Sequence, residues 1–186
     1  MVGLSEFSFD NNETFTCDSS GCGGVLQTDT VASMTSSSLY TTTPLFYGNV
    51  FQPNTSVTLD EFEMYVGPNS SCNIDFYVYS GPTDSGPWTE EWSDSIAASS
   101  GTRWLSSGAI NLGLASSDFY LLAIDVDPSH CGGRVKRHWK RSASDDPGFG
   151  TYEGYWYESY TGTWNSPSNS SGSRGGQYMQ RVHSWY

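Results

Sequence analysis

The stretch CNIDFYVY, residues 72–79, alternates polar or small side chains with large apolar ones. A β-strand points successive side chains to opposite faces, so Ile74, Phe76 and Val78 share one face. The other face takes Asn73, Asp75, Tyr77 and Tyr79. We expect the first face in a hydrophobic core and the second in water.

The same pattern continues on both sides of this stretch. Residues 57–67 place Phe62, Met64 and Val66 inward, whereas residues 118–126 are almost continuously apolar, which is typical of a central strand. No stretch of ten or more residues carries the apolar stripe of a helix. Strands are predicted at residues 6–10, 44–53, 57–67, 72–81, 88–93, 108–114, 118–126, 133–141, 154–160 and 176–185. The chain is therefore expected to be all-β, a single two-sheet antiparallel β-sandwich domain over residues 1–186 with jelly-roll connectivity.

The four cysteines form two natural pairs. Cys17 and Cys22 flank a short Ser- and Gly-rich turn, whereas Cys72 opens one predicted strand and Cys131 follows another, so antiparallel neighbours would bring the second pair together. A zinc site that uses Cys131 and a nearby histidine is the alternative, although no pair of CxxC motifs is present. Disulfides at Cys17–Cys22 and Cys72–Cys131 predict an oxidising compartment, hence a secreted or cell-surface protein.

The charge of the chain bears on its partners. The net charge of -12 disfavours nucleic acid, and no apolar run is long enough to insert into a membrane.

The order of strand-like runs also carries a resemblance. The runs FYGNVFQPNTSVTLDEFEMYVG, IDFYVYSGPTDSGPW, GTRWLSSGAINLGL and DFYLLAIDV follow one another between residues 45 and 127. This order resembles the secreted jelly-roll modules of bacterial extracellular and surface proteins, including some carbohydrate-binding modules. The resemblance implies a binding function, but such modules differ in ligand, so it assigns no functional residue.

The run YEGYWYESYTGTW, residues 152–164, is unusually rich in aromatic residues. Aromatic faces can cover the apolar face of a sugar ring, and Tyr and Trp add a polar tip for hydroxyls. The candidate ligand-binding residues are Tyr155, Trp156, Tyr157, Tyr160 and Trp164. The alternative is that these rings close the open end of the core.

The run RVKRHWKR, residues 134–141, holds five of the eight Lys and Arg residues of the chain. Strand alternation places Val135, Arg137, Trp139 and Arg141 on one side. The other side is uniformly basic and supplies further candidate ligand-binding residues, Arg134, Lys136, His138 and Lys140. This side is expected to contact a sulfated or uronic-acid glycan, to contact an acidic patch on another copy, or to be balanced internally by Glu61, Glu63 and Asp75.

Acidic residues near strand ends raise the question of a metal. Asp125 and Asp127, together with Asp10, offer the hard oxygen ligands that calcium prefers, so a structural calcium is one hypothesis and solvated acids are the other. The common catalytic motifs are absent, and no catalytic residue is predicted.

These observations favour a non-enzymatic extracellular module that binds carbohydrate or a cell-surface glycan. The alternative is a structural or adhesive subunit that assembles with other copies of itself into a fibre or sheath. A glycan-active enzyme is a third, weaker hypothesis.

Overall fold

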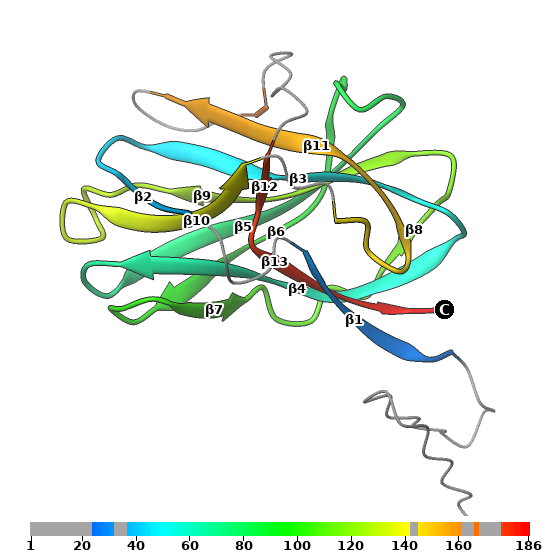
Figure 1. Cartoon of the computed structure of the whole chain (residues 1–186), viewed down its shortest axis with the longest axis horizontal. Coiled ribbons are helices and arrows are strands. Elements are labelled where there is room, and N and C mark those ends of the chain that lie inside the picture. The colour runs from blue at the N-terminus through cyan, green and yellow to red at the C-terminus, as the bar shows by residue number, and fades with distance from the viewer. Residues whose placement is uncertain (1–23, 32–36, 142–144, 161–165, 168–175) are drawn as a thin grey trace, which may run out of the picture.

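The computed structural model describes residues 24–31, 37–141, 145–160, 166–167 and 176–186, and every helix or strand element in them is a strand. These strands form two antiparallel sheets, one of eight strands and one of five (Figure 1). The predicted all-β, two-sheet sandwich is confirmed. Its jelly-roll connectivity stays a prediction.

The five-stranded sheet has the order β11–β3–β9–β5–β6. Its strands are β3 (Leu45–Pro53), β5 (Cys72–Gly81), β6 (Thr89–Ala98), β9 (Phe119–Val126) and β11 (Gly150–Ser159). β9 lies in the middle and is buried along nearly its whole length, as its continuous apolar sequence predicts.

The eight-stranded sheet is organised around β4 (Val57–Pro68). Its other strands are β1 (Leu26–Val31), β2 (Ser37–Thr41), β7 (Arg103–Ser106), β8 (Leu112–Leu114), β10 (Val135–Arg141), β12 (Gly176–Tyr178) and β13 (Gln180–Trp185). β4 pairs with β13 and β10 along one edge and with β8 and β7 along the other. β2 then adds to the far edge of β10, and β1 to the far edge of β13.

The core lies between the two sheets. The predicted inward residues of β4 and β5 are all at most 1% exposed, namely Phe62, Met64, Val66, Ile74, Phe76 and Val78. The rings of Phe62 and Phe76 have centroids 5.2 Å apart and connect one sheet to the other. Strand alternation therefore identified these core residues correctly.

One disulfide joins the start of β5 to the turn between β9 and β10. Cys72 and Cys131 are bonded with Cα atoms 5.1 Å apart, which confirms the predicted pair. The Cys131 carbonyl also accepts hydrogen bonds from the backbone N–H groups of Asn69 and Ser70, so the turn before β5 is tied to the turn after β9. This bridge fits an extracellular protein. Cys17 and Cys22, like the predicted strand at 6–10, lie outside the described residues.

The outer face of the five-stranded sheet corrects one expectation. Tyr79 was expected in water but is 2% exposed. It belongs to a second buried cluster formed by Phe46, Val50, Tyr79, Leu121, Ala123 and Trp156. Large rings on neighbouring strands of this face cover one another, so alternation alone misassigned this tyrosine.

No helix able to cross a membrane occurs in the described part of the chain.

Candidate functional site: a tyrosine-lined pocket around Arg137

The aromatic run does not form a single surface. Its residues 152–159 lie on β11, where alternation turns Tyr155 toward β10 and β12 and turns Trp156 to the opposite face. Trp156 is 1% exposed and packs edge-on against Trp88 in the outer cluster. Tyr157, at 40% exposed, is on the same side as Tyr155. The predicted ligand set is therefore divided between two faces, and Trp164 lies outside the described residues.

One part of the run lines a pocket between the two sheets. The pocket has a volume of about 200 Å³. Its lining residues come from β2, β10, β11 and β12 and are Leu39, Arg137, Trp139, Tyr155, Tyr157 and Tyr178. We call it the Arg137 pocket. Two of the predicted aromatic residues, Tyr155 and Tyr157, line it. They lie with Arg137 and Trp139, on the side of β10 for which the sequence predicts no ligand contact.

Arg137 is the only charged side chain among these lining residues. Its guanidinium carbon lies 4.6 Å from the centroid of the Tyr157 ring, and its Nη1 donates a hydrogen bond of 3.0 Å to the hydroxyl of Tyr178. No carboxylate among the described residues forms an ion pair with it. The pocket thus contains a positive charge held by aromatic rings and a neutral hydroxyl.

Several buried polar atoms in and beside the pocket have no hydrogen-bond partner in the described structure. They include Nε of Arg137, Nε1 of Trp139 and the hydroxyl of Tyr47. The Tyr47 ring packs 4.6 Å from that of Tyr178. Leaving a buried donor unpaired costs on the order of 1–3 kcal/mol. Burial also raises the pKa values of Tyr47 and Tyr178, so both hydroxyls stay protonated at neutral pH.

The four basic residues predicted for ligand contact lie on the outer side of β10 or, for Arg134, directly before it. The Arg134 guanidinium lies 4.9 Å from the Tyr40 ring centroid, and the His138 ring meets Tyr65 at 4.6 Å. Burial, and then the charge of Lys136, lowers the pKa of His138, which favours a neutral imidazole. Lys140 lies 3.8 Å from the carboxylate of Asp145. These four side chains face away from the pocket.

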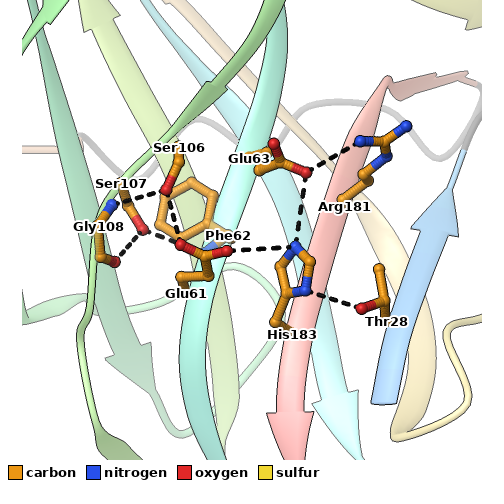
Figure 2. A network of polar contacts seen from close by, with 9 residues as sticks. All are labelled: Thr28, Glu61, Phe62, Glu63, Ser106, Ser107, Gly108, Arg181 and His183. Carbon is orange, nitrogen blue, oxygen red and sulfur yellow. Dashed lines mark hydrogen bonds and ion pairs between the residues drawn. The ribbon is translucent and has the colours of Figure 1, made fainter. Parts of the chain in front are cut away.

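The acids proposed to balance this basic side have other partners. Figure 2 shows His183 between Glu61 and Glu63, at 3.6 and 3.5 Å, with Arg181 3.2 Å from Glu63. His183 also contacts the hydroxyl of Thr28 at 2.8 Å. This network links β1, β13 and β4.

The third acid, Asp75, lies on β5 in the other sheet. In the described structure, Glu61, Glu63 and Asp75 form no ion pair with the basic strand.

The predicted metal-ligating residues have different surroundings. The hydroxyl of Tyr160 lies 2.7 Å from both carboxylate oxygens of Asp125, and Asp75 is directly opposite on the neighbouring strand. Burial is the main cause that raises the pKa of Asp125 to about 6, and the charges of Asp75 and Asp127 add to it. Asp127 instead accepts hydrogen bonds from Ser129.

Among the described residues, no three His, Cys, Asp or Glu side chains form a group that could hold a metal ion. The third predicted ligand, Asp10, lies outside them.

Sequence reasoning missed four lining residues: Leu39, Arg137, Trp139 and Tyr178. Strand alternation had grouped Arg137 with Trp139, which was the available signal. The opposite side of the strand is uniformly basic, and the prediction of ligand contact was therefore made for that side. Nothing in the sequence indicated that β11 of one sheet would lie beside β10 and β12 of the other.

Comparisons of the chain with protein-family models, curated proteins and solved structures gave no match. The function is therefore argued from the chemistry of the pocket.

Proposed function

We propose that this protein is a non-enzymatic, secreted binding module that recognises carbohydrate through the Arg137 pocket. The observation that carries the proposal is the partly buried Arg137, which has no acidic partner among the described residues and is enclosed by aromatic rings. Its chemistry favours a sugar that bears a carboxylate or sulfate.

The lining residues supply two complementary kinds of contact. The rings of Tyr155, Tyr157 and Trp139 offer apolar faces to the C–H groups of a sugar ring. A guanidinium has five N–H donors and can hold a carboxylate or sulfate with two parallel hydrogen bonds. Arg137 uses one of these donors on Tyr178, so others remain for a ligand.

Trp139 contributes its ring to the lining, whereas its indole Nε1 is buried against Gly176.

The size of the pocket limits what it can enclose. Its volume of about 200 Å³ is below the roughly 300–1,000 Å³ of pockets that enclose drug-sized ligands. It therefore suits one terminal or branching sugar unit, with the rest of the glycan outside.

Structural calcium is a separate prediction from this proposal. Asp125 and Asp127 already engage Tyr160 and Ser129, and neither lines the pocket. Carbohydrate binding as proposed here does not depend on calcium.

A glycan array that includes neutral, carboxylated and sulfated sugars tests the proposal. The wild-type protein is expected to select acidic glycans, and Tyr157→Ala is expected to abolish the signal because it removes one wall of the pocket and the ring beneath Arg137. Tyr40→Ala is the matched control, since Tyr40 is exposed on β2 and does not line the pocket. No glycan binding by folded wild-type protein, or equal loss in both variants, would contradict the proposal.

A further inference from the structure

Two of the edge strands, β2 in the eight-stranded sheet and β6 in the five-stranded sheet, have surroundings of opposite charge. No described strand pairs with the outer edge of β2 in the eight-stranded sheet, or with the outer edge of β6 in the five-stranded sheet. Unpaired edges offer backbone N–H and C=O groups to another strand. We propose that these two edges join different copies of the chain, β2 of one copy against β6 of the next.

The β2 edge is flanked by positive charge and exposed apolar side chains. Leu39 and Tyr40 are 41% and 58% exposed. Arg134 stacks over Tyr40, and Lys136 is directly opposite Tyr40 in the β10–β2 register. Neither Arg134 nor Lys136 forms an ion pair within the described residues.

The β6 edge is acidic. Glu90, Glu91 and Asp94 are all exposed on this strand. Their described hydrogen bonds come from neutral donors, including the hydroxyl of Ser80 to Glu91 and that of Ser93 to Glu90. No cation among the described residues pairs with these carboxylates.

The charges select which edges can meet. Two β6 edges would bring carboxylates together, and two β2 edges would bring the Arg134 and Lys136 charges together, so contacts between like edges are disfavoured. A β2 edge against a β6 edge pairs opposite charges and extends both sheets. A second copy of the chain is therefore the partner that the charges fit.

The positions of the two edges determine the kind of assembly. β11 lies beside β10 and β12, because Tyr155 packs against Trp139 and Tyr178. β6 is at the opposite end of the five-stranded sheet from β11 and thus on the opposite side of the sandwich from β2. A contact between two different surfaces on opposite sides is heterologous and generates an open chain of copies unless the rotation closes a ring.

Assembly and ligand binding use different charged groups of β10, although Leu39 of β2 lines the pocket as well as the edge. Lys136 faces outward, whereas Arg137 lines the pocket. The proposed contact therefore does not rest on carbohydrate binding, and either can fail without the other.

Two neutral double variants test the contact by analytical ultracentrifugation of the full chain. One is Arg134→Gln with Lys136→Gln, and the other is Glu91→Gln with Asp94→Asn. Wild type is expected to form chains at about 0.01 M salt, where the Debye length is about 30 Å, and to dissociate at about 1 M, where it is about 3 Å. Each variant alone should sediment as a monomer at both salt concentrations.

Mixing the two variants gives the sharpest result. Each retains the edge that the other lacks, so an equimolar mixture at low salt should form one-to-one dimers and no longer species. Asp118→Lys, in the turn before β9, is the control charge change and should assemble as wild type does. Monomeric wild type at low salt, wild-type assembly by both variants, or a mixture that stays monomeric would overturn the proposal.

Discussion

Asp125 is a carboxylate whose surroundings disfavour its charged form. It is 9% exposed, faces Asp75 across the sheet, lies near the charge of Asp127, and has only the Tyr160 hydroxyl as a described side-chain hydrogen-bond donor. Its pKa rises from 3.8 to about 6 on folding, so between about pH 4 and 6 the folded state binds more protons than the unfolded chain. The free energy of unfolding is therefore expected to fall as the pH rises through that window, by about 2–3 kcal/mol for the two-unit shift.

Asp125→Asn should remove this loss, because the amide is neutral and still accepts a hydrogen bond from Tyr160. Urea unfolding between pH 4 and pH 7 measures the effect. The variant is expected to be more stable than wild type at neutral pH and to have a flatter profile. Asp75→Asn should move the wild-type transition to lower pH because it removes a repulsive neighbour. Identical profiles for wild type and Asp125→Asn would refute this account.

Gly48 shows why one position in β3 must lack a side chain. A Cβ there would approach the Cβ of Ala123 to 2.6 Å and contact the carbonyl oxygen of Leu122 more closely still, and both neighbours belong to the central strand β9. Gly48→Ala is expected to lower the free energy of unfolding by about 2–3 kcal/mol, as overpacked core substitutions do. Gly113→Ala is the matched control, because a Cβ at that position meets nothing within 4 Å. Thermal unfolding should distinguish the two, and equal melting temperatures would contradict the packing argument.

For single strands, alternation predicted the core residues between the two sheets better than the buried residues on the outer face of the five-stranded sheet. The inward side chains of β4 and β5 follow directly from period-2 patterning, because one face of each strand must be apolar. Alternation did not predict the burial of Tyr79, because the side chains that bury it, including Trp156, are distant from it in the sequence. Strands β1 and β2, with the sequences LQTDTV and SSLYT, were missed because they are short and largely polar.

The candidate site was predictable only in part, for the same physical reason. The sequence identified Tyr155 and Tyr157 as ligand candidates and grouped Arg137 with Trp139 on one side of a strand. It could not show that these groups face each other, because β10 and β11 belong to different sheets. Contacts between sheets depend on long-range topology, which local alternation does not encode.

The bridge between Cys72 and Cys131 joins elements that are far apart in the sequence. It closes a loop of 59 residues, for which the chain-entropy relation gives a stabilisation of about 4 kcal/mol. Replacing both cysteines with alanine should lower the free energy of unfolding by about this amount and shift the urea midpoint down. The backbone hydrogen bonds that Asn69 and Ser70 donate to residue 131 should remain. Urea unfolding followed by circular dichroism measures the change. Equal midpoints would show that the bridge does not stabilise the fold.

At the scale of the whole molecule, the net charge of -12 conceals a strong local asymmetry. Glu61 and Glu63 are engaged by residues of β13, so they do not neutralise the basic strand in the described structure. On that outer side Lys140 lies near Asp145, whereas Arg134 and Lys136 form no ion pair among the described residues; the inner side supplies the cation of the pocket. A single strand thus supports both proposals through opposite faces.

Arg137 is the residue that we propose recognises the acidic group of a sugar. Isothermal titration calorimetry with a uronic-acid oligosaccharide and its neutral methyl ester, against wild type and Arg137→Gln, tests this proposal most directly. Because hydrogen bonds to charged groups contribute about 1.5–3 kcal/mol, wild type should bind the acid about ten- to a hundredfold more tightly than the ester. Arg137→Gln should bind both with the same weak affinity. Equal binding of acid and ester by wild type, or an unchanged preference in Arg137→Gln, would contradict the claim.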